Sequence, residues 1–277
     1  MSSKIGIMQG RLSKSVNGKI QSFPINSWKK EFYLAKEIGF ELIEWVLDDD
    51  LQNNPILNKK TFPEIESLKN DTGIDINSIC CDYFMKNSLS PNSKSFKKKN
   101  LEIIDLLIKE SCPKNNIKII DLPLMGVDGL KDKKISEDYQ NLFSSLEKEL
   151  LANNLIIAIE NDLNPEEFEN FLKNVNKKII TVNYDMGNSA YREYNMRKEF
   201  LSYGQSISNV HIKDCTPKDY TVPLGSGNVD FDGVFQLLKN NNYKENFILQ
   251  AARGKDDIQT AKEQLNFIKV FISKYFQ

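Results

Sequence analysis

The sequence predicts an α/β fold, a single (β/α)₈ barrel that spans residues 1–277. Eight short β-rich runs alternate with longer amphipathic segments, at the spacing expected of repeated βα units. Several of these runs are almost entirely apolar, which is typical of parallel strands covered on both faces. The length of 277 residues also suits one barrel, which needs roughly 250. No linker or change in composition divides the chain, so one domain is expected.

The predicted strands cover residues 5–9, 42–47, 76–83, 118–124, 155–161, 179–185, 208–214 and 247–251. An open doubly wound sheet is the alternative to a closed barrel. Such a sheet normally shows a Gly-rich phosphate loop after its first strand. Here the first run leads into Gln9-Gly10-Arg11-Leu12, which is no such loop. The closed barrel is therefore the predicted architecture.

The segments between the runs carry apolar residues at helical spacing, for example Trp28, Phe32, Ala35 and Ile38. Gly39 and a later glycine, Gly73, are expected just past helix ends, where a left-handed residue is favoured. After the fifth run, Asn164 is expected to cap a helix that begins with Pro165 and carries Glu167 in its first turn. The last apolar helical face is formed by Ile258, Ala261, Leu265, Ile268 and Ile272.

Composition excludes several classes of function. The formal net charge is −1, so the basic excess typical of nucleic-acid binding is missing. No apolar stretch reaches the length of a signal peptide or a membrane helix. The four cysteines include an adjacent pair and no Cys-x-x-Cys spacing, which predicts free thiols. We expect a cytoplasmic protein without a nucleic-acid or membrane partner.

In a barrel of this kind the chemistry gathers at the carboxyl ends of the strands. The polar residues expected there are Gln9, Arg11, Glu44, Asp82, Tyr83, Asp121, Glu160, Asn161, Asn183, Asp185, Asn188, His211, Lys213, Asp214, Gln250 and Arg253. Three of them, on the fifth, sixth and seventh strands, are the candidates for a shared metal site.

Glu160, Asp185 and His211 each have a structural explanation when taken alone. Glu160 follows five apolar residues and could pair with Lys213 or Arg253. Asp185 could cap a helix or form an Asx turn, and a lone histidine is often structural. Together, however, two carboxylates and one imidazole on successive strands point toward one volume. This set suits Mn²⁺, Mg²⁺ or Co²⁺ better than Zn²⁺, so one divalent ion is predicted.

Several short motifs follow one another along the chain in a distinctive order. They are Gly6-Ile7-Met8-Gln9-Gly10-Arg11, Ile43-Glu44-Trp45, Ile159-Glu160-Asn161, Tyr184-Asp185-Met186-Gly187-Asn188, His211-Ile212-Lys213-Asp214 and Pro223-Leu224-Gly225-Ser226-Gly227-Asn228-Val229-Asp230-Phe231. In their order and spacing the chain resembles the xylose-isomerase-like barrel superfamily of sugar isomerases and epimerases. The first two motifs resemble a sugar-phosphate isomerase or epimerase subgroup.

The resemblance implies a divalent metal held by a glutamate, an aspartate, a histidine and a second glutamate. Glu160, Asp185 and His211 match the first three places, and Gln250 stands in the fourth. In epimerases of this type the two glutamates lie on opposite faces of the substrate, one removing a proton and the other returning it. Glutamine cannot act as a base, so Gln250 argues against that two-glutamate mechanism.

Three interpretations follow from Gln250. Glu160 could be a single base that moves one proton between adjacent carbons, which gives aldose–ketose isomerisation through an enediolate. Alternatively Glu44, Asp82 or Lys213 replaces the second base. Finally, the barrel could bind a sugar without catalysis. Glu160 and Lys213 are the candidate catalytic residues.

The predicted substrate is a small sugar or sugar derivative, phosphorylated or otherwise anionic. Arg11, Lys213 and Arg253 could pair with a phosphate or carboxylate, and the 225–227 turn could donate backbone N–H groups or simply form a tight turn. The substrate-binding candidates are Gln9, Arg11, Glu44, Asp82, Asn188, Asp214 and Arg253.

Two other reactions are weighed against isomerisation and epimerisation. A lyase or dehydratase on the same barrel begins with the same proton abstraction, so the sequence hardly separates it. Hydrolysis of a nucleic-acid backbone, as in the superfamily's repair enzymes, is disfavoured by the single histidine. Exposed aromatics around Trp28 and Trp45 are compatible with a homodimer.

Overall fold

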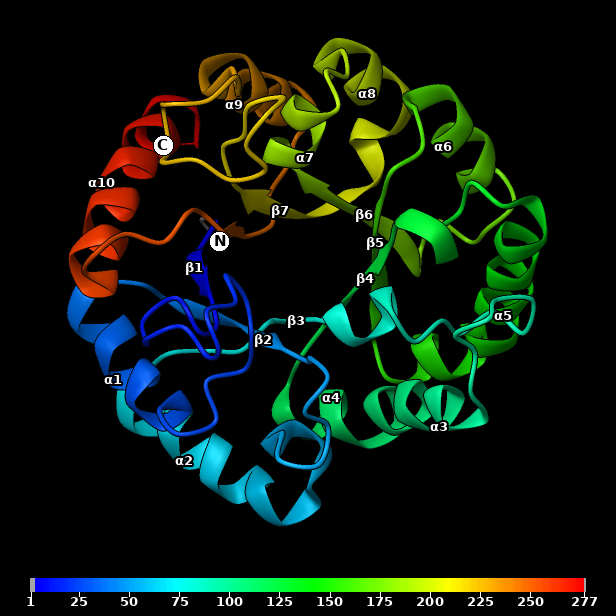
Figure 1. The fold of residues 1–277 in the computed structure, drawn as a ribbon, viewed down its shortest axis with the longest axis horizontal. Helices are drawn as coiled ribbons and strands as arrows, with labels where there is room; N and C mark the ends of the chain where they lie inside the picture. Colours follow the sequence, from blue (N-terminus) through cyan, green and yellow to red (C-terminus); the bar gives the residue numbers. More distant parts are fainter. Residues whose placement is uncertain (1–2, 277) are drawn as a thin grey trace.

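Eight parallel strands follow one another around a closed barrel in sequence order, with helices outside them (Figure 1). This computed structural model describes residues 3–276. The strands are β1 (Ile5–Met8), β2 (Leu42–Val46), β3 (Ser78–Cys80), β4 (Ile119–Leu124), β5 (Ile156–Asn161), β6 (Ile180–Asp185), β7 (Ile207–Ile212) and β8 (Phe247–Leu249). Because β8 pairs with β1, the predicted barrel is confirmed and the open sheet is excluded.

Helices connect the strands and form the outer layer. They are α1 (Trp28–Ile38), α2 (Phe62–Thr72), α3 (Lys98–Leu106), α4 (Cys112–Asn115), α5 (Lys133–Ala152), α6 (Pro165–Leu172), α7 (Met186–Tyr191), α8 (Met196–Tyr203), α9 (Phe231–Asn240) and α10 (Asp257–Phe276). The 3₁₀ turns are η1 (Pro55–Leu57), η2 (Lys59–Thr61), η3 (Asp82–Met85), η5 (Gly126–Asp128) and η6 (Gly204–Ser206). A short π-helical segment, η4 (Leu107–Ser111), joins α3 to α4.

The predicted helix ends are confirmed. Gly39 ends α1 at φ 98° and Gly73 ends α2 at φ 75°, in the left-handed region that favours glycine. At the start of α6, the Asn164 side chain accepts from the Glu167 backbone N–H, and the Glu167 carboxylate accepts from Asn164 N. This reciprocal cap fixes the helix directly after β5, the strand that carries Glu160.

The third strand is shorter than predicted, because the run over 76–83 forms a strand only at Ser78–Cys80. Asp82 instead begins η3, where Tyr83 N donates to Leu47 O at 2.9 Å and Phe84 N donates to Cys81 O at 3.0 Å. The turn takes Asp82 out of the strand's alternation, and its carboxylate lies beside Gln21 in the loop after β1.

The apolar core lies between the strands and the helices, and both tryptophans belong to it. Trp28 is 4% exposed and Trp45 is fully buried, so neither tryptophan is itself an exposed aromatic, whereas Tyr33 on α1 is 50% exposed. The homodimer stays a prediction. The four cysteines are free and buried, as expected. Within residues 3–276, no helix is long and apolar enough to cross a membrane.

Candidate active site

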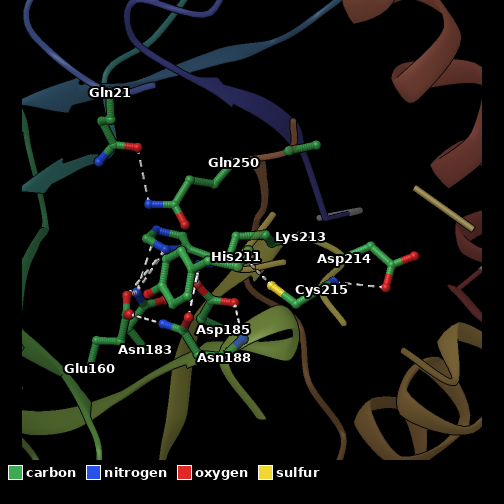
Figure 2. A network of polar contacts seen from close by, with 12 residues as sticks. Gln21, Glu160, Asn183, Asp185, Asn188, His211, Lys213, Asp214, Cys215 and Gln250 are labelled. Carbon is green, nitrogen blue, oxygen red and sulfur yellow. Dashed lines mark hydrogen bonds and ion pairs between the residues drawn. The ribbon is translucent and has the colours of Figure 1, made fainter. Parts of the chain in front are cut away.

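The register of β5, β6 and β7 decides which side chains meet inside the barrel. Asp185 pairs with His211 along β6 and β7, and Asn183 pairs with Asn209. A register shift between Val182 and Asn183 precedes these pairs. Because side chains two apart share a face, the carboxyl ends of these strands direct a polar group into the barrel (Figure 2).

His211 is the centre of this group and is completely buried. Its Nε2 lies 2.6 Å from Glu44 Oε1 and 3.8 Å from Asp121 Oδ2, while its Nδ1 lies 3.5 Å from Glu160 Oε2. Burial lowers the pKa of His211, but Glu44 and the other carboxylates outweigh it and raise that pKa well above its ordinary value. Glu44 behaves oppositely: burial raises its pKa, and His211 brings it below the ordinary value.

Glu160 is held by two amides and by the imidazole of His211. Its carboxylate accepts from Asn183 Nδ2 at 3.2 Å and from Asn188 Nδ2. No ion pair joins Glu160 to Lys213 or Arg253 within the described residues, so the salt-bridge explanation weighed above is not what the structure contains. One Glu160 carboxylate oxygen remains close to the imidazole of His211.

Asp185 is a helix cap, which is one of the structural roles considered for it. It caps α7 by accepting from Asn188 N at 2.8 Å, and its Oδ2 lies 2.8 Å from Lys213 Nζ. Lys213 also donates to Asn188 Oδ1 at 2.9 Å and lies over the Tyr220 ring. Burial opposes the charge of Lys213, yet Asp185, Tyr220 and Glu160 together raise its pKa, so Lys213 remains an ammonium group.

Asp121 on β4 is fully buried, and neither of its carboxylate oxygens accepts a hydrogen bond from the residues that the structure describes. Burial, with Glu160 and Glu44 nearby, raises the pKa of Asp121 well above its ordinary value, although His211 opposes the shift. Single donor atoms of Asp121, Glu160 and His211 lie within 4.8 Å of one another. A second such group consists of Glu44, Cys80 and Asp121.

Gln250, in the fourth predicted metal position, belongs to a chain of amides. Its Nε2 donates to Gln21 Oε1 at 3.2 Å, and Gln21 Nε2 donates to Asp82 Oδ2 at 2.7 Å (Figure 2 shows the first contact). Arg11 Nη2 also donates to Gln21 Oε1, at 3.1 Å. The Gln250 carbonyl oxygen is buried and has no hydrogen-bond partner among residues 3–276. Burial, more than any neighbouring charge, raises the pKa of Asp82.

A cavity of about 180 Å³ opens at this end of the barrel. Its walls include Arg11, Ile20, Gln21, Asp82, Met85, Pro123, Met125, Glu160, Lys213, Tyr220, Thr221 and Gln250. Two carboxylates, Asp82 and Glu160, therefore share one cavity, and they come from different strand ends. Ile20, Met85 and Met125 supply apolar surface to the same cavity.

Other predicted residues lie outside this cavity. Asp214 is buried and accepts from the backbone N–H groups of Gly225 at 2.9 Å and Gly227 at 2.8 Å, so the turn that was considered for phosphate already holds a carboxylate. Arg253 donates to backbone carbonyls of the β1 loop and pairs with Asp257. Gln9 accepts from Val46 N in the barrel wall.

Two residues of the site were given no role from the sequence. Asp121 was expected at the end of its strand, and its position inside the apolar run Ile119–Leu124 is the signal that could have marked it as a site residue. Gln21 lies in the loop after β1, and no periodicity or spacing distinguishes it. Its place in the site depends on how that loop folds over the barrel mouth.

Comparison with known proteins gives a consistent result. A family model described as xylose isomerase-like TIM barrel matches residues 32–271. The Haemophilus influenzae protein named "Putative L-ribulose-5-phosphate 3-epimerase SgbU" is 26% identical over 271 residues, covering 92% of this chain and 90% of that protein. L-ribulose-5-phosphate 3-epimerase UlaE of Salmonella heidelberg is 23% identical over 240 residues, covering 80% and 81%.

Among solved structures, an L-ribulose 3-epimerase superposes with a TM-score of 0.78 at 16% identity, covering 99% of this chain and 95% of that one. D-psicose 3-epimerase of Clostridium cellulolyticum H10, solved with D-tagatose, superposes with a TM-score of 0.77 at 14% identity, covering 97% and 99%. At these identities the structural likeness establishes the fold.

Proposed function

The chain belongs to the xylose isomerase-like TIM barrel family, and on that premise we propose that it is a metal-dependent ketose 3-epimerase. The observation that carries the proposal is the pair of carboxylates, Glu160 and Asp82, in the walls of one cavity. Epimerisation requires one group to remove the proton α to the carbonyl and another to return a proton on the other face. The curated relatives named as 3-epimerases of ribulose phosphate support C3 as the carbon.

Asp82 fits the second role better than the two other residues considered for it. Glu44 is fully buried and already accepts from His211, Ser78 and Asn209. Lys213 stays charged because Asp185 pairs with it, so it has no lone pair to offer. Asp82 lines the cavity, and burial raises its pKa, which favours the protonated form that can donate a proton.

The reaction then proceeds without any net change in oxidation state. Glu160 accepts the proton from C3, the C3–H electron pair forms the C2–C3 double bond, and the C2 carbonyl oxygen gains the negative charge. Asp82 then gives its proton to the other face of C3, and the carbonyl re-forms. The Lys213 side chain lies in the cavity wall, where its positively charged ammonium group lowers the energy of the developing oxyanion.

The residues present also fit a divalent ion. Within the described part of the chain, buried oxygens of Asp121 and Gln250 have no hydrogen-bond partner. Glu160 and His211 add a carboxylate and an imidazole. Such hard donors suit Mn²⁺, Mg²⁺ or Co²⁺. When bound, the ion would polarise the substrate carbonyl. The predicted ligand set of Glu160, Asp185, His211 and Gln250 stays a prediction.

The proposal is tested with variants of the two carboxylates in D₂O. The Mn²⁺-loaded protein is incubated with L-ribulose, D-psicose and D-tagatose and their phosphate esters, and deuterium is located by NMR. Glu160→Gln and Asp82→Asn keep the shape of each side chain and remove its acid–base function. We expect both variants to lose epimer formation by at least about 100-fold.

Each variant should retain exchange from the one epimer whose proton the remaining carboxylate still reaches. Exchange without inversion is the signature of a two-base site with one base removed. If the wild-type protein exchanges deuterium with none of these sugars, it is not an epimerase. Deuterium at C1 alone would instead indicate the single-base isomerase, and loss of a hydroxyl group would indicate a dehydratase.

A further inference from the structure

We infer that Gln21 is a positioning residue of the proposed epimerisation, and that its side-chain amide orients the Asp82 carboxyl group for proton transfer. The inference rests on the proposed function and adds to it a residue from the loop between β1 and α1. Gln21 lines the same cavity as Asp82 and Glu160. It acts through Asp82 rather than on the reacting carbon.

The neighbours of the Gln21 amide allow it only one orientation. Its Oε1 accepts from Arg11 Nη2 at 3.1 Å and from Gln250 Nε2 at 3.2 Å (Figure 2 shows the contact with Gln250). A guanidinium group has no acceptor atom, so the amide oxygen must face Arg11. The amide N–H groups then face the other way, and Nε2 donates to Asp82 Oδ2 at 2.7 Å. Gln21 is therefore a donor to Asp82.

Asp82 depends on this donor because its contact on the other oxygen is weaker. Asp82 Oδ1 lies 3.4 Å from Cys80 Sγ, and a thiol is a weak donor. Burial raises the pKa of Asp82, whereas the hydrogen bonds from Gln21 and Cys80 oppose that rise. Gln21 thus fixes the direction of the carboxyl group, and it also favours the charged form that accepts a proton in the reverse reaction.

The loop that carries Gln21 is fastened across the barrel mouth by an arginine. Arg253 Nη1 donates to Ser13 O at 2.8 Å, and its Nε donates to Ile20 O at 2.9 Å. The stretch between these two carbonyl groups, residues 14–19, is mostly exposed, and Ile20 immediately precedes Gln21. The amide therefore reaches the carboxyl group from a fixed backbone, as is required to hold a reacting group within about 0.5 Å of its productive geometry.

The competing explanation is that Gln21 only fastens the loop, through Arg11 and Gln250. In that case its loss weakens substrate binding or loosens the cavity, and all chemistry at C3 slows together. If Gln21 orients Asp82, only the step that uses Asp82 slows. The proton that Glu160 has removed then returns to the face it came from, after exchange with the solvent.

The test is deuterium incorporation by the full-length, Mn²⁺-loaded protein in D₂O, starting in turn from L-ribulose and from its C3 epimer. Gln21→Met removes the donor and keeps the length of the side chain. We expect epimer formation to fall by about 10- to 100-fold, since a small misplacement of a reacting group can cost about 100-fold. Deuterium should now appear at C3 of the unreacted sugar from one starting epimer only, the one whose C3 proton Glu160 removes.

Lys19→Met is the matched control, because Lys19 is an exposed residue of the same loop outside the cavity, and it should give wild-type products. In Gln21→Glu the new carboxylate still accepts from Arg11 and Gln250 but, above neutral pH, cannot donate to Asp82. It should show the same one-sided exchange, and it decides alone if Gln21→Met does not fold. Slower epimer formation without exchange into either starting sugar, or wild-type products from Gln21→Glu, would overturn the inference.

A measurement without substrate separates this inference from the proposed function. The pKa of Asp82 is followed through the ¹³C signal of its carboxyl group, which Asp82→Asn identifies. Gln21→Met should raise that pKa, because the lost hydrogen bond favours the charged form, and Lys19→Met should leave it unchanged. An unchanged pKa in Gln21→Met refutes the inference even if the wild-type protein is an epimerase. A wild type that exchanges no ketose proton instead removes the proposed function, and the positioning role with it.

Discussion

Replacing Gln250 by glutamate, the residue that the family pattern has at this position, should slow the enzyme. Gln250 Nε2 donates to Gln21 Oε1 at 3.2 Å, and Gln21 in turn donates to Asp82 at 2.7 Å. In Gln250→Glu two acceptor oxygens face each other. If the Gln21 amide rotates to meet the new carboxylate, its oxygen turns toward Asp82 and the contact that orients Asp82 is lost. Either way one hydrogen bond disappears.

The magnitude follows from that single contact. Leaving a buried polar group without its partner costs about 1–3 kcal/mol. If this cost falls on the transition state, turnover drops by about 5- to 150-fold. Binding of Mn²⁺ should not weaken, because a carboxylate replaces a carboxamide near the ion. The expected result is therefore lower kcat with metal affinity at least equal to that of the wild type.

The assay is the initial rate of epimer formation at saturating Mn²⁺, with metal affinity measured in parallel. Gln259→Glu on α10 is the matched control, because it adds the same charge at an exposed position outside the cavity, where the Gln259 side chain donates to Glu263. The control should turn over at the wild-type rate. A Gln250→Glu variant faster than the wild type would refute the amide chain and show that position 250 is where the second base belongs.

Three further predictions follow from other parts of the site. Lys213→Met should lower kcat by about 100-fold, measured at saturating ketose, because a cation beside the developing oxyanion is lost; an unchanged kcat would remove Lys213 from the mechanism. Arg11 is already bonded to Ala251 O and Gln21, and Lys213 is paired with Asp185, so neither cation is free to bind a phosphate. Free ketoses should therefore have a higher kcat/KM than their phosphate esters in competition assays. The reverse order would show that one of these cations is released to bind phosphate. Burial raises the pKa of Glu31 to about 7 from 4.5, so the unfolded state loses this proton first. The free energy of unfolding should therefore fall by roughly 3 kcal/mol from this group as pH rises from about 4.5 to above 7, and denaturant titrations of Glu31→Gln should lack that slope.

The barrel could be predicted because its signals are local. Alternating apolar runs, the Asn164–Glu167 cap and the glycine at the end of α1 each depend on a few neighbouring residues. The predicted third strand was wrong at its carboxyl end, because Asp82 begins a 3₁₀ turn there. In that turn the Tyr83 amide donates to Leu47 O, in the loop after the neighbouring strand. A contact across strands of that kind leaves no trace in the run itself.

The site was harder to predict because its contacts are distant in the sequence. His211 bonds to Glu44, 167 residues away, and Gln250 bonds to Gln21, 229 residues away. The register shift between β6 and β7 places Asp185 beside His211. No pattern in the sequence predicts that shift. Asp121 shows the limit most clearly, since its lack of a hydrogen-bond partner is visible only when every surrounding side chain is in place.

The central claim is that a proton leaves C3 and that a different group replaces it from the other face. The most direct measurement is the position of deuterium after brief turnover of the wild-type, Mn²⁺-loaded protein in D₂O with L-ribulose. We predict one deuterium at C3 of the epimer and none in the remaining substrate. Epimer formed without deuterium at C3, or deuterium found only at C1, would contradict the two-carboxylate account.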